Sequence, residues 1–218
     1  MSLRHEPEVS VADWIVAADA PWDVLAAHGP PGFEAYVTVR FDGDDTDHYR
    51  PDPELVAEVT RLAAEHTTTP ERAWFALWDG WGEIDGGRTY TAMDSDRLFG
   101  RMFSAPRPVE AVPAFGPDVL AGPRVDLCGV RSYLLFVGAT HDVGAWPARP
   151  PRPGWPSDLP QASFTWPADR AWCIASDVDA DELTVGGSAR LAEALLRNGG
   201  LEARSTDPWA PREPGSPR

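Results

Sequence analysis

The chain has 218 residues, of which 34 are acidic and 19 basic, so its formal net charge at pH 7 is −15. This negative field repels a phosphate backbone, which excludes sequence-independent nucleic-acid binding and favours a basic protein partner or simply high solubility. All the basic residues are arginines, so Schiff-base chemistry and the lysine of a phosphate-binding P-loop are also excluded.

The apolar patterning predicts a soluble, cytoplasmic protein. No apolar run reaches the about 18 residues that a membrane span needs, and residues 1–10 lack the apolar core of a secretory signal. The length fits a single domain over residues 1–205, and a proline-rich composition predicts a disordered tail over residues 206–218.

The first half of the chain contains helical and strand patterns in turn. Residues 11–27 have a helix-compatible apolar spacing that Pro21 interrupts, and residues 33–41 show the near-alternation of a strand. An Asp-Pro pair then begins a predicted helix over residues 53–64, whose apolar residues form one stripe.

The second half contains the other predicted strands, at residues 73–78, within 124–137 and at 171–177. Residues 83–120 lack periodicity and are interpreted as an irregular excursion. Six prolines make residues 146–160 an extended loop.

The order of these elements indicates an α+β class. A serine after two glycines begins a second predicted helix over residues 188–197, and residues 201–204 are a candidate last strand. We expect one mixed or mainly antiparallel sheet, with the helices at 53–64 and 188–197 packed on one face.

A tryptophan-rich segment carries a resemblance to a known group of proteins. The run FTWPADRAWCIASDVD at 164–179, followed by TVGGS at 184–188, resembles a family of uncharacterised actinobacterial cytoplasmic proteins that share a W-P-x-D-R-A-W-C segment and a V-G-G-S helix start. The chain departs from this pattern at residues 181–183. The resemblance implies a bacterial, cytoplasmic single domain and transfers no catalytic residue. Further matching segments are residues 12–15, 32–36, 69–71, 74–82 and 131–138.

Acidic residues gather at two places with metal-friendly ligands. Asp177, Asp179 and Asp181 begin like a calcium loop, but the later positions that need Gly and Glu hold Glu and Ser instead. The second group lies within residues 42–48 and has no fixed ligand spacing. Solvated carboxylates are favoured at both places, and we predict no metal and no cofactor.

The two cysteines, Cys128 and Cys173, lie in apolar stretches without CxxC spacing. Buried, reduced thiols are therefore expected, with a disulfide as the alternative if their strands are adjacent.

The ten tryptophans leave two interpretations open. They form an aromatic core, or some of them are anchors around a binding surface, where tryptophan is enriched. Asp169 and Arg170 either pair to hold a turn, or Arg170 faces a pocket and binds an anion. The candidate ligand- or partner-binding residues are Trp78, Trp81, Trp166, Asp169, Arg170, Trp172, Asp177 and Asp179.

Two functions follow from these features. The leading hypothesis is a non-catalytic protein-binding module, immunity- or inhibitor-like, whose acidic face engages a basic protein. The alternative is an enzyme or small-ligand-binding protein with a tryptophan-lined pocket, which predicts a deep cavity and a strongly shifted carboxylate. No catalytic residue can be assigned to either.

Overall fold

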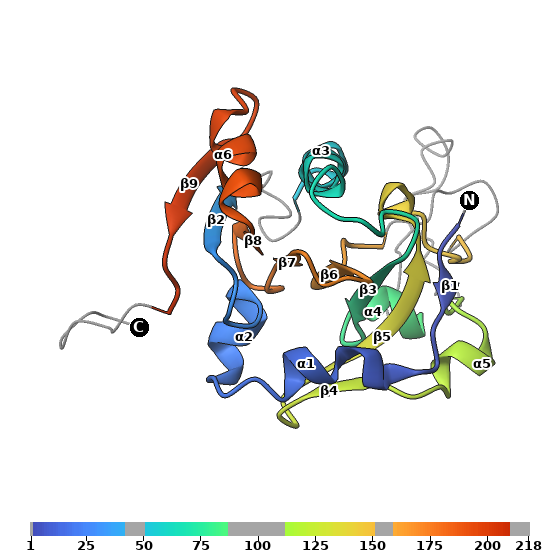
Figure 1. The fold of residues 1–218 in the computed structure, drawn as a ribbon. Coiled ribbons are helices and arrows are strands. Elements are labelled where there is room, and N and C mark those ends of the chain that lie inside the picture. The colour runs from blue at the N-terminus through green and yellow to red at the C-terminus, as the bar shows by residue number, and fades with distance from the viewer. Residues whose placement is uncertain (1, 42–50, 87–111, 151–158, 210–218) are drawn as a thin grey trace, which may run out of the picture. The chain divides into compact units, whose positions relative to one another are not determined.

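The computed structural model describes residues 2–41, 51–86, 112–150 and 159–209 (Figure 1). The chain divides into two compact units. The larger unit contains the whole β-sheet and consists of Met1–Asp79, Pro123–Trp146 and Pro160–Arg218. The smaller unit consists of Gly80–Gly122 and Pro147–Leu159.

Within the described residues, the sheet of the larger unit has nine strands in the order β1-β5-β3-β6-β7-β8-β2-β9, with β4 paired to β5. Every strand pairing in it is antiparallel, which confirms the predicted α+β class and the mainly antiparallel sheet. The strands are β1 (Arg4–His5), β2 (Ala35–Arg40), β3 (Ala73–Trp78), β4 (Val125–Leu127), β5 (Arg131–Gly138), β6 (Phe164–Pro167), β7 (Cys173–Ala175), β8 (Glu182–Gly187) and β9 (Glu202–Thr206).

The strongest β-forming runs became the strands β2, β3 and β5 with almost the predicted bounds. The strand predicted at 171–177 is limited to the three residues of β7. The short strands β1 and β6 and the strand β8 were not predicted. β9 extends to Thr206, and Trp209 packs against the core, so residues 206–209 are not part of a disordered tail.

The two long helices begin at the predicted caps. In α3 (Pro53–Ala64) the Asp52 carboxylate accepts a hydrogen bond of 2.8 Å from the Glu54 N–H. In α6 (Ala189–Arg197) the Ser188 hydroxyl accepts one of 3.2 Å from the Leu191 N–H. These bonds satisfy amide groups that a helix start leaves without intrahelical partners.

The N-terminal segment forms short helices rather than one. They are the 3-10 helix η1 (Val9–Ala12), α1 (Asp13–Val16) and α2 (Trp22–His28), which begins after Pro21, the residue predicted to interrupt the pattern. A further 3-10 helix, η3 (Thr140–Asp142), follows β5.

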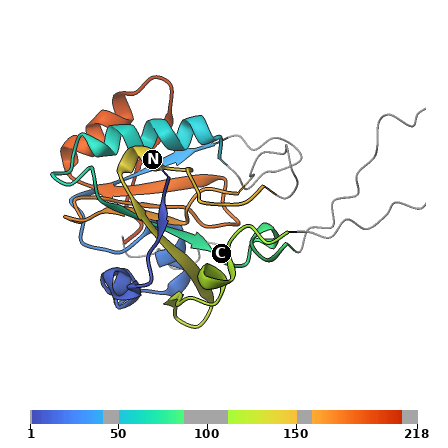
Figure 2. The ribbon, with the colours of Figure 1, turned by 90° about the vertical axis from the view of Figure 1, so that its right-hand side faces the viewer.

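Helices cover both faces of the sheet. The α3-side core contains Val59 of α3, Leu191 of α6 and Val37 of β2. The α2-side core contains Leu25 of α2, Ile15 of α1 and residues of the strands β3 to β7. Figures 1 and 2 show α3 and α6 together on one face and α1 and α2 on the other. The two predicted helices thus share a face as expected, and the opposite face is covered by helices of the N-terminal segment.

The smaller unit corresponds to most of the predicted irregular excursion and part of the proline-rich loop. Its described part contains the one-turn helices α4 (Gly82–Asp85) and α5 (Pro117–Leu120). Backbone bonds join its segments, because the Ala114 N–H donates to the Ile84 carbonyl at 3.1 Å and the Arg149 N–H donates to the Ala114 carbonyl at 2.7 Å. Residues 87–111 and 151–158 lie outside the described residues.

Candidate functional site

Three of the predicted site residues meet around an arginine that the sequence did not single out. Arg131 begins β5, and its guanidinium lies over the ring of Trp78 at 4.9 Å and over that of Trp22 at 5.9 Å. One guanidinium nitrogen of Arg131 lies 3.2 Å from an Asp177 oxygen and 3.0 Å from an Asp179 oxygen. We call these five residues the Arg131 cluster.

Burial differs across the Arg131 cluster. The side chains of Arg131 and Asp177 are 13% and 20% exposed, whereas that of Asp179 is 75% exposed. Burial raises the pKa of the neighbouring Tyr133 well above its ordinary value, and the Asp177 carboxylate raises it further. The phenol is therefore neutral at physiological pH, and the Arg131 charge is already matched by two carboxylates. The two ion pairs join the β7–β8 loop to β5.

Trp166 and Trp172 lie inside the protein. Trp166 is fully buried in the α2-side core, stacked on Trp74 with ring centroids 6.0 Å apart and packed edge-on against Trp14 at 6.3 Å. Trp172 is fully buried in the α3-side core. The interpretation of these two residues as anchors on a surface is therefore wrong, because their indole surface is already in contact with the core.

Asp169 and Arg170 do not form the expected local pair. The Asp169 carboxylate accepts hydrogen bonds of 2.7 Å and 2.8 Å from the hydroxyls of Thr67 and Thr68 and others from the amides of Thr68 and Ala171. Burial alone would raise the pKa of Asp169, but these bonds outweigh it and lower the pKa to about 2. Arg170 has a left-handed φ of 53° and extends over the Trp14 ring at 5.3 Å.

Two other predictions concern residues away from these groups. Trp81 is half-buried in the smaller unit, immediately before α4. Both cysteines are free, and the prediction that both are buried is correct only for Cys173, whose thiol pKa burial raises. Cys128 is exposed because it sits in the turn between β4 and β5, with a φ of 56°.

No group of three potential metal ligands occurs among the residues that the structure describes. The acidic segment within 42–48 lies outside that part of the chain. The three acids that resemble the start of a calcium loop face arginines instead. An Asp181 carboxylate oxygen lies 3.7 Å from the guanidinium of Arg40, and the carboxylates of Asp177 and Asp179 are both directed to Arg131.

Two hollows lie along β2 and β9, away from the predicted residues. One has a volume of about 440 Å³ and is lined by residues from 31–36 and 205–209, including Tyr36 and Trp209. The other has a volume of about 600 Å³ and is lined by Arg40, by residues 181–182 at the start of β8 and by residues 202–204 of β9. None of the predicted binding residues lines either hollow.

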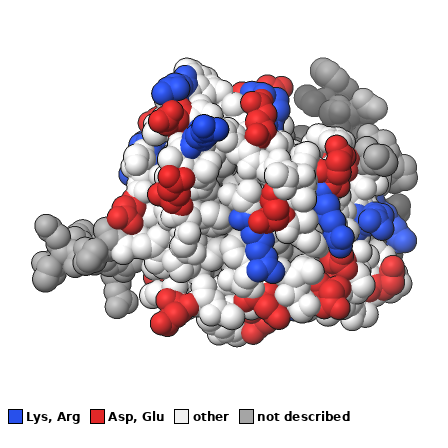
Figure 3. Space-filling view, in the orientation of Figure 1, with Lys and Arg blue, Asp and Glu red and all other residues white. Residues whose placement is uncertain are grey.

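An acidic surface lies on the N-terminal helical layer instead. Its carboxylates come from residues 6–23, and no arginine occurs between Arg4 and Arg40. Half-buried Trp14 and Trp22 lie among these acids in the sequence. Figure 3 shows several acidic groups along the lower edge of the view, where Figure 1 places α1 and α2, with a basic group above them. The residues of this acidic surface are Glu6, Glu8, Asp13, Asp19 and Asp23, of which all but the half-buried Glu6 are exposed.

The acidic surface has a signal in the sequence that the net charge of the whole chain does not reveal. The charge is unevenly distributed, with a long N-terminal stretch that has acids and no arginine. None of the five carboxylates has a cationic partner within 4 Å among the described residues.

Comparisons with protein-family models, with curated proteins and with solved structures found no match. The resemblance to the actinobacterial family therefore stays a prediction. Within the described ranges no helix is both long enough and apolar enough to cross a membrane.

Proposed function

We propose that this protein is a non-catalytic module that binds a basic protein partner through the acidic surface. The observation that carries this proposal is the charge of that surface. Its five carboxylates lie within residues 6–23, a stretch of the chain without arginine, and within the described residues none of the five is in an ion pair.

Electrostatics explains why such a surface suits a basic partner. Like charges held on one rigid layer repel one another, and a cationic surface placed against them relieves that repulsion. Charge complementarity of this kind also raises the association rate and disfavours acidic competitors. The same surface repels nucleic acid, which agrees with the net charge of −15.

The anchoring of the layer supports the same function. Trp22 at the start of α2 lies against Arg131, and Trp14 of α1 packs on Trp166 and beside Arg170. Leu25 is fully buried beneath α2. A surface fixed in this way loses little conformational entropy on binding, and its half-buried indoles add apolar contact area among the carboxylates.

The test compares two variants that remove the same number of charges from different places. The surface variant carries Glu8→Gln, Asp13→Asn, Asp19→Asn and Asp23→Asn. The control variant neutralises four exposed acids elsewhere: two in α3 and α6, one directly after α3 and one before β3. It carries Glu54→Gln, Glu65→Gln, Glu71→Gln and Glu193→Gln. Both variants change the net charge by the same amount at different positions. The control also removes two exposed ion pairs, those of Glu65 with Arg61 and of Glu193 with Arg197, so the folding of both variants is checked first.

The immobilised protein is exposed to native lysate at low and at high salt, and a captured protein is identified, purified and titrated calorimetrically. We expect a basic partner whose affinity falls with salt. Its affinity should fall at least about tenfold for the surface variant and less than about twofold for the control. An acidic partner, equal losses in both variants, or no partner at all would contradict the proposal.

A further inference from the structure

The strand β9 forms one edge of the sheet. Among the described residues its neighbour in the sheet is β2 alone, and Figure 1 shows it on the outer side of β2. It has five residues and no proline, so its outer backbone groups are suited to pair with another strand. This edge is independent of the acidic surface and of the function proposed for it.

The register of β2 identifies which backbone groups of β9 point outward. The Phe41 N–H donates to the Asp181 carbonyl at 3.0 Å, so the odd-numbered residues of β2 bond to β8 and its even-numbered residues bond to β9. Thr38 lies opposite Arg204 in the β2–β9 pair. The N–H and C=O of Ala203 and Ser205 therefore point away from β2, and they have no partner among the described residues.

The charges beside Ala203 are self-complementary. In an antiparallel pair of two β9 strands centred on Ala203, Glu202 of each copy lies opposite Arg204 of the other. A shift of the centre by one residue places Glu202 opposite Glu202, or Arg204 opposite Arg204. The outward direction of the odd-numbered groups excludes registers that pair an odd residue with an even one. Hydrogen bonding thus excludes the odd–even registers, charge disfavours those centred on Glu202 or Arg204, and together they favour the register centred on Ala203.

Within one copy, Glu202 and Arg204 can each form a further ion pair. Glu202 is exposed and has no ion pair among the described residues, although Arg40 lies opposite it on β2 and pairs with Asp181. Arg204 is 65% exposed and directs one nitrogen to Glu182 at 2.6 Å. A guanidinium has five N–H donors, so the others can reach a carboxylate of a second copy.

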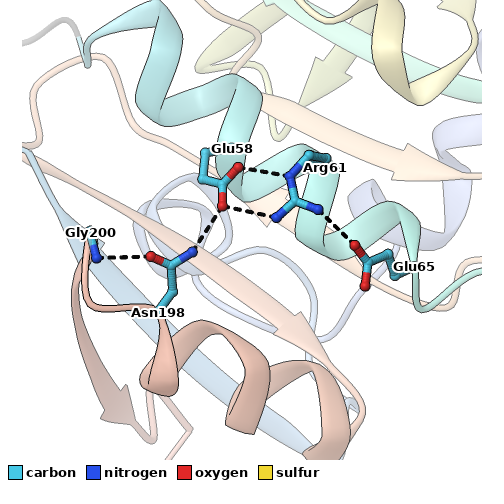
Figure 4. A network of polar contacts seen from close by, with 5 residues as sticks. All are labelled: Glu58, Arg61, Glu65, Asn198 and Gly200. Carbon is cyan, nitrogen blue, oxygen red and sulfur yellow. Dashed lines mark hydrogen bonds and ion pairs between the residues drawn. The ribbon is translucent and has the colours of Figure 1, made fainter.

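An exposed leucine of α6 lies on the same side of the larger unit as β9. Leu191 and Leu195 of α6 face the core, whereas Leu196 is 44% exposed. Asn198 marks the flank of α6 that faces α3, because its side-chain amide donates to Glu58 at 2.9 Å (Figure 4). Leu196 is about 200° from Asn198 around the helix. It therefore lies on the opposite flank, on the side where Figure 1 shows β9.

We propose that the chain forms a two-fold homodimer in which β9 pairs antiparallel with β9 of a second copy, centred on Ala203. The two-fold axis of such a pair runs perpendicular to the sheet, so both α6 helices lie on the same face with their Leu196 flanks turned toward each other. The two nine-stranded sheets become one continuous sheet. One strand pair and one helix contact bury less than a standard interface of about 1,600 Å², which is the size class of weak association, and we expect a dissociation constant in the micromolar range.

The first experiment measures the mass of the full chain by sedimentation velocity over about 1 to 300 µM, a range that brackets a micromolar Kd. Ala203→Pro removes an N–H that the β2–β9 ladder does not use, and an edge strand tolerates proline at such a position. We expect the wild type to dimerise, Ala203→Pro to stay monomeric and folded by circular dichroism, and the control Ala203→Ser to dimerise as the wild type does.

The second experiment tests the register. Glu202→Arg and Arg204→Glu each place like charges opposite each other in a homodimer, and each should weaken association at least about tenfold. When the two variants are mixed, two arginines on one chain face two glutamates on the other, and a heterodimer should form.

A wild type that is monomeric at the highest concentration overturns the proposal, as does a dimer that Ala203→Pro and Glu202→Arg leave intact. A mixture of folded single variants that fails to associate overturns the register. If Arg204→Glu does not fold beside Glu182, the Ala203→Pro and Glu202→Arg measurements still decide.

Discussion

Two turns flank the strand β7, and each is fastened by a carboxylate in a different way. Before β7, Asp169 accepts hydrogen bonds from neutral donors in the loop at Thr67 and Thr68. After β7, Asp177 pairs with the cation of Arg131, which also lies over two indole rings. Asp169 is exposed and has no cationic partner among the described residues, whereas Asp177 is only 20% exposed and is paired with Arg131.

The comparison indicates what each turn contributes. Hydrogen bonds to a charged acceptor stabilise the turn before β7 without any cation, so that turn depends on the ionisation of one acid. In the turn after β7, Asp177 and Asp179 share a single arginine, and the loss of that cation leaves the two carboxylates together. The stability of the two turns should therefore respond differently to substitution and to pH.

The largest expected effect is that of Arg131→Met, which keeps the length of the side chain and removes its charge. Asp177 then loses its counterion while it is 20% exposed, so the free energy of unfolding should fall by about 3 kcal/mol. Urea unfolding at pH 7 measures this loss of stability. The control Arg197→Met breaks an exposed pair with Glu193 and should change stability by less than about 0.5 kcal/mol. Equal losses in the two variants would contradict the distinction.

Asp177→Asn should have the next largest effect. The amide keeps one acceptor for the Val178 N–H, which donates to Asp177 at 2.7 Å, but it leaves Arg131 with only the exposed Asp179 as a counterion. We expect a loss of about 2 kcal/mol in urea unfolding. Arg131→Met and Asp177→Asn remove the same contact, so their effects should not add. Fully additive losses in the double variant would show that the two side chains act independently.

Asp169→Asn tests the turn before β7 through pH. The folded-state pKa of Asp169 is about 2, below its unfolded value of 3.8, so this group stabilises the fold above about pH 4 and loses that effect as the pH falls toward 2. Because the carboxylate is exposed, we expect a loss of only about 1 kcal/mol at pH 7. The difference between wild type and variant should shrink below pH 4 in urea titrations. A difference that is constant from pH 7 to pH 2.5 would contradict the account.

The sequence predicted the strands whose apolar patterns are strong and the helices that begin with side-chain caps. It failed for β8, where Gly186 and Gly187 resemble a helix start. The glycines are needed in the strand itself, because a Cβ on Gly186 would lie 2.5 Å from the Phe33 ring. β6 has only four residues, too few for a periodic pattern to be recognised against its proline-rich surroundings.

The candidate site was predictable in its acids and not in their partners. The chain pattern marked Asp169, Asp177 and Asp179, but their partners lie far away in sequence, at Thr67 and Arg131. Only the strand order brings these segments together. Tryptophans beside charged residues are also ambiguous in the sequence. Burial decides whether an indole belongs to the core or to the surface, and burial is a property of the fold.

The smallest effect is expected for Asp179→Asn, which sharpens the comparison within the Arg131 cluster. Asp179 and Asp177 contact the same nitrogen of Arg131 at similar distances, but Asp179 is 75% exposed. Water already solvates its charge, so the loss in urea unfolding should be below about 0.5 kcal/mol, several times less than for Asp177→Asn. Equal losses for the two variants would mean that distance to the cation, rather than burial, sets the strength of each pair. Unequal losses in the expected order assign the stability of this turn to the buried carboxylate.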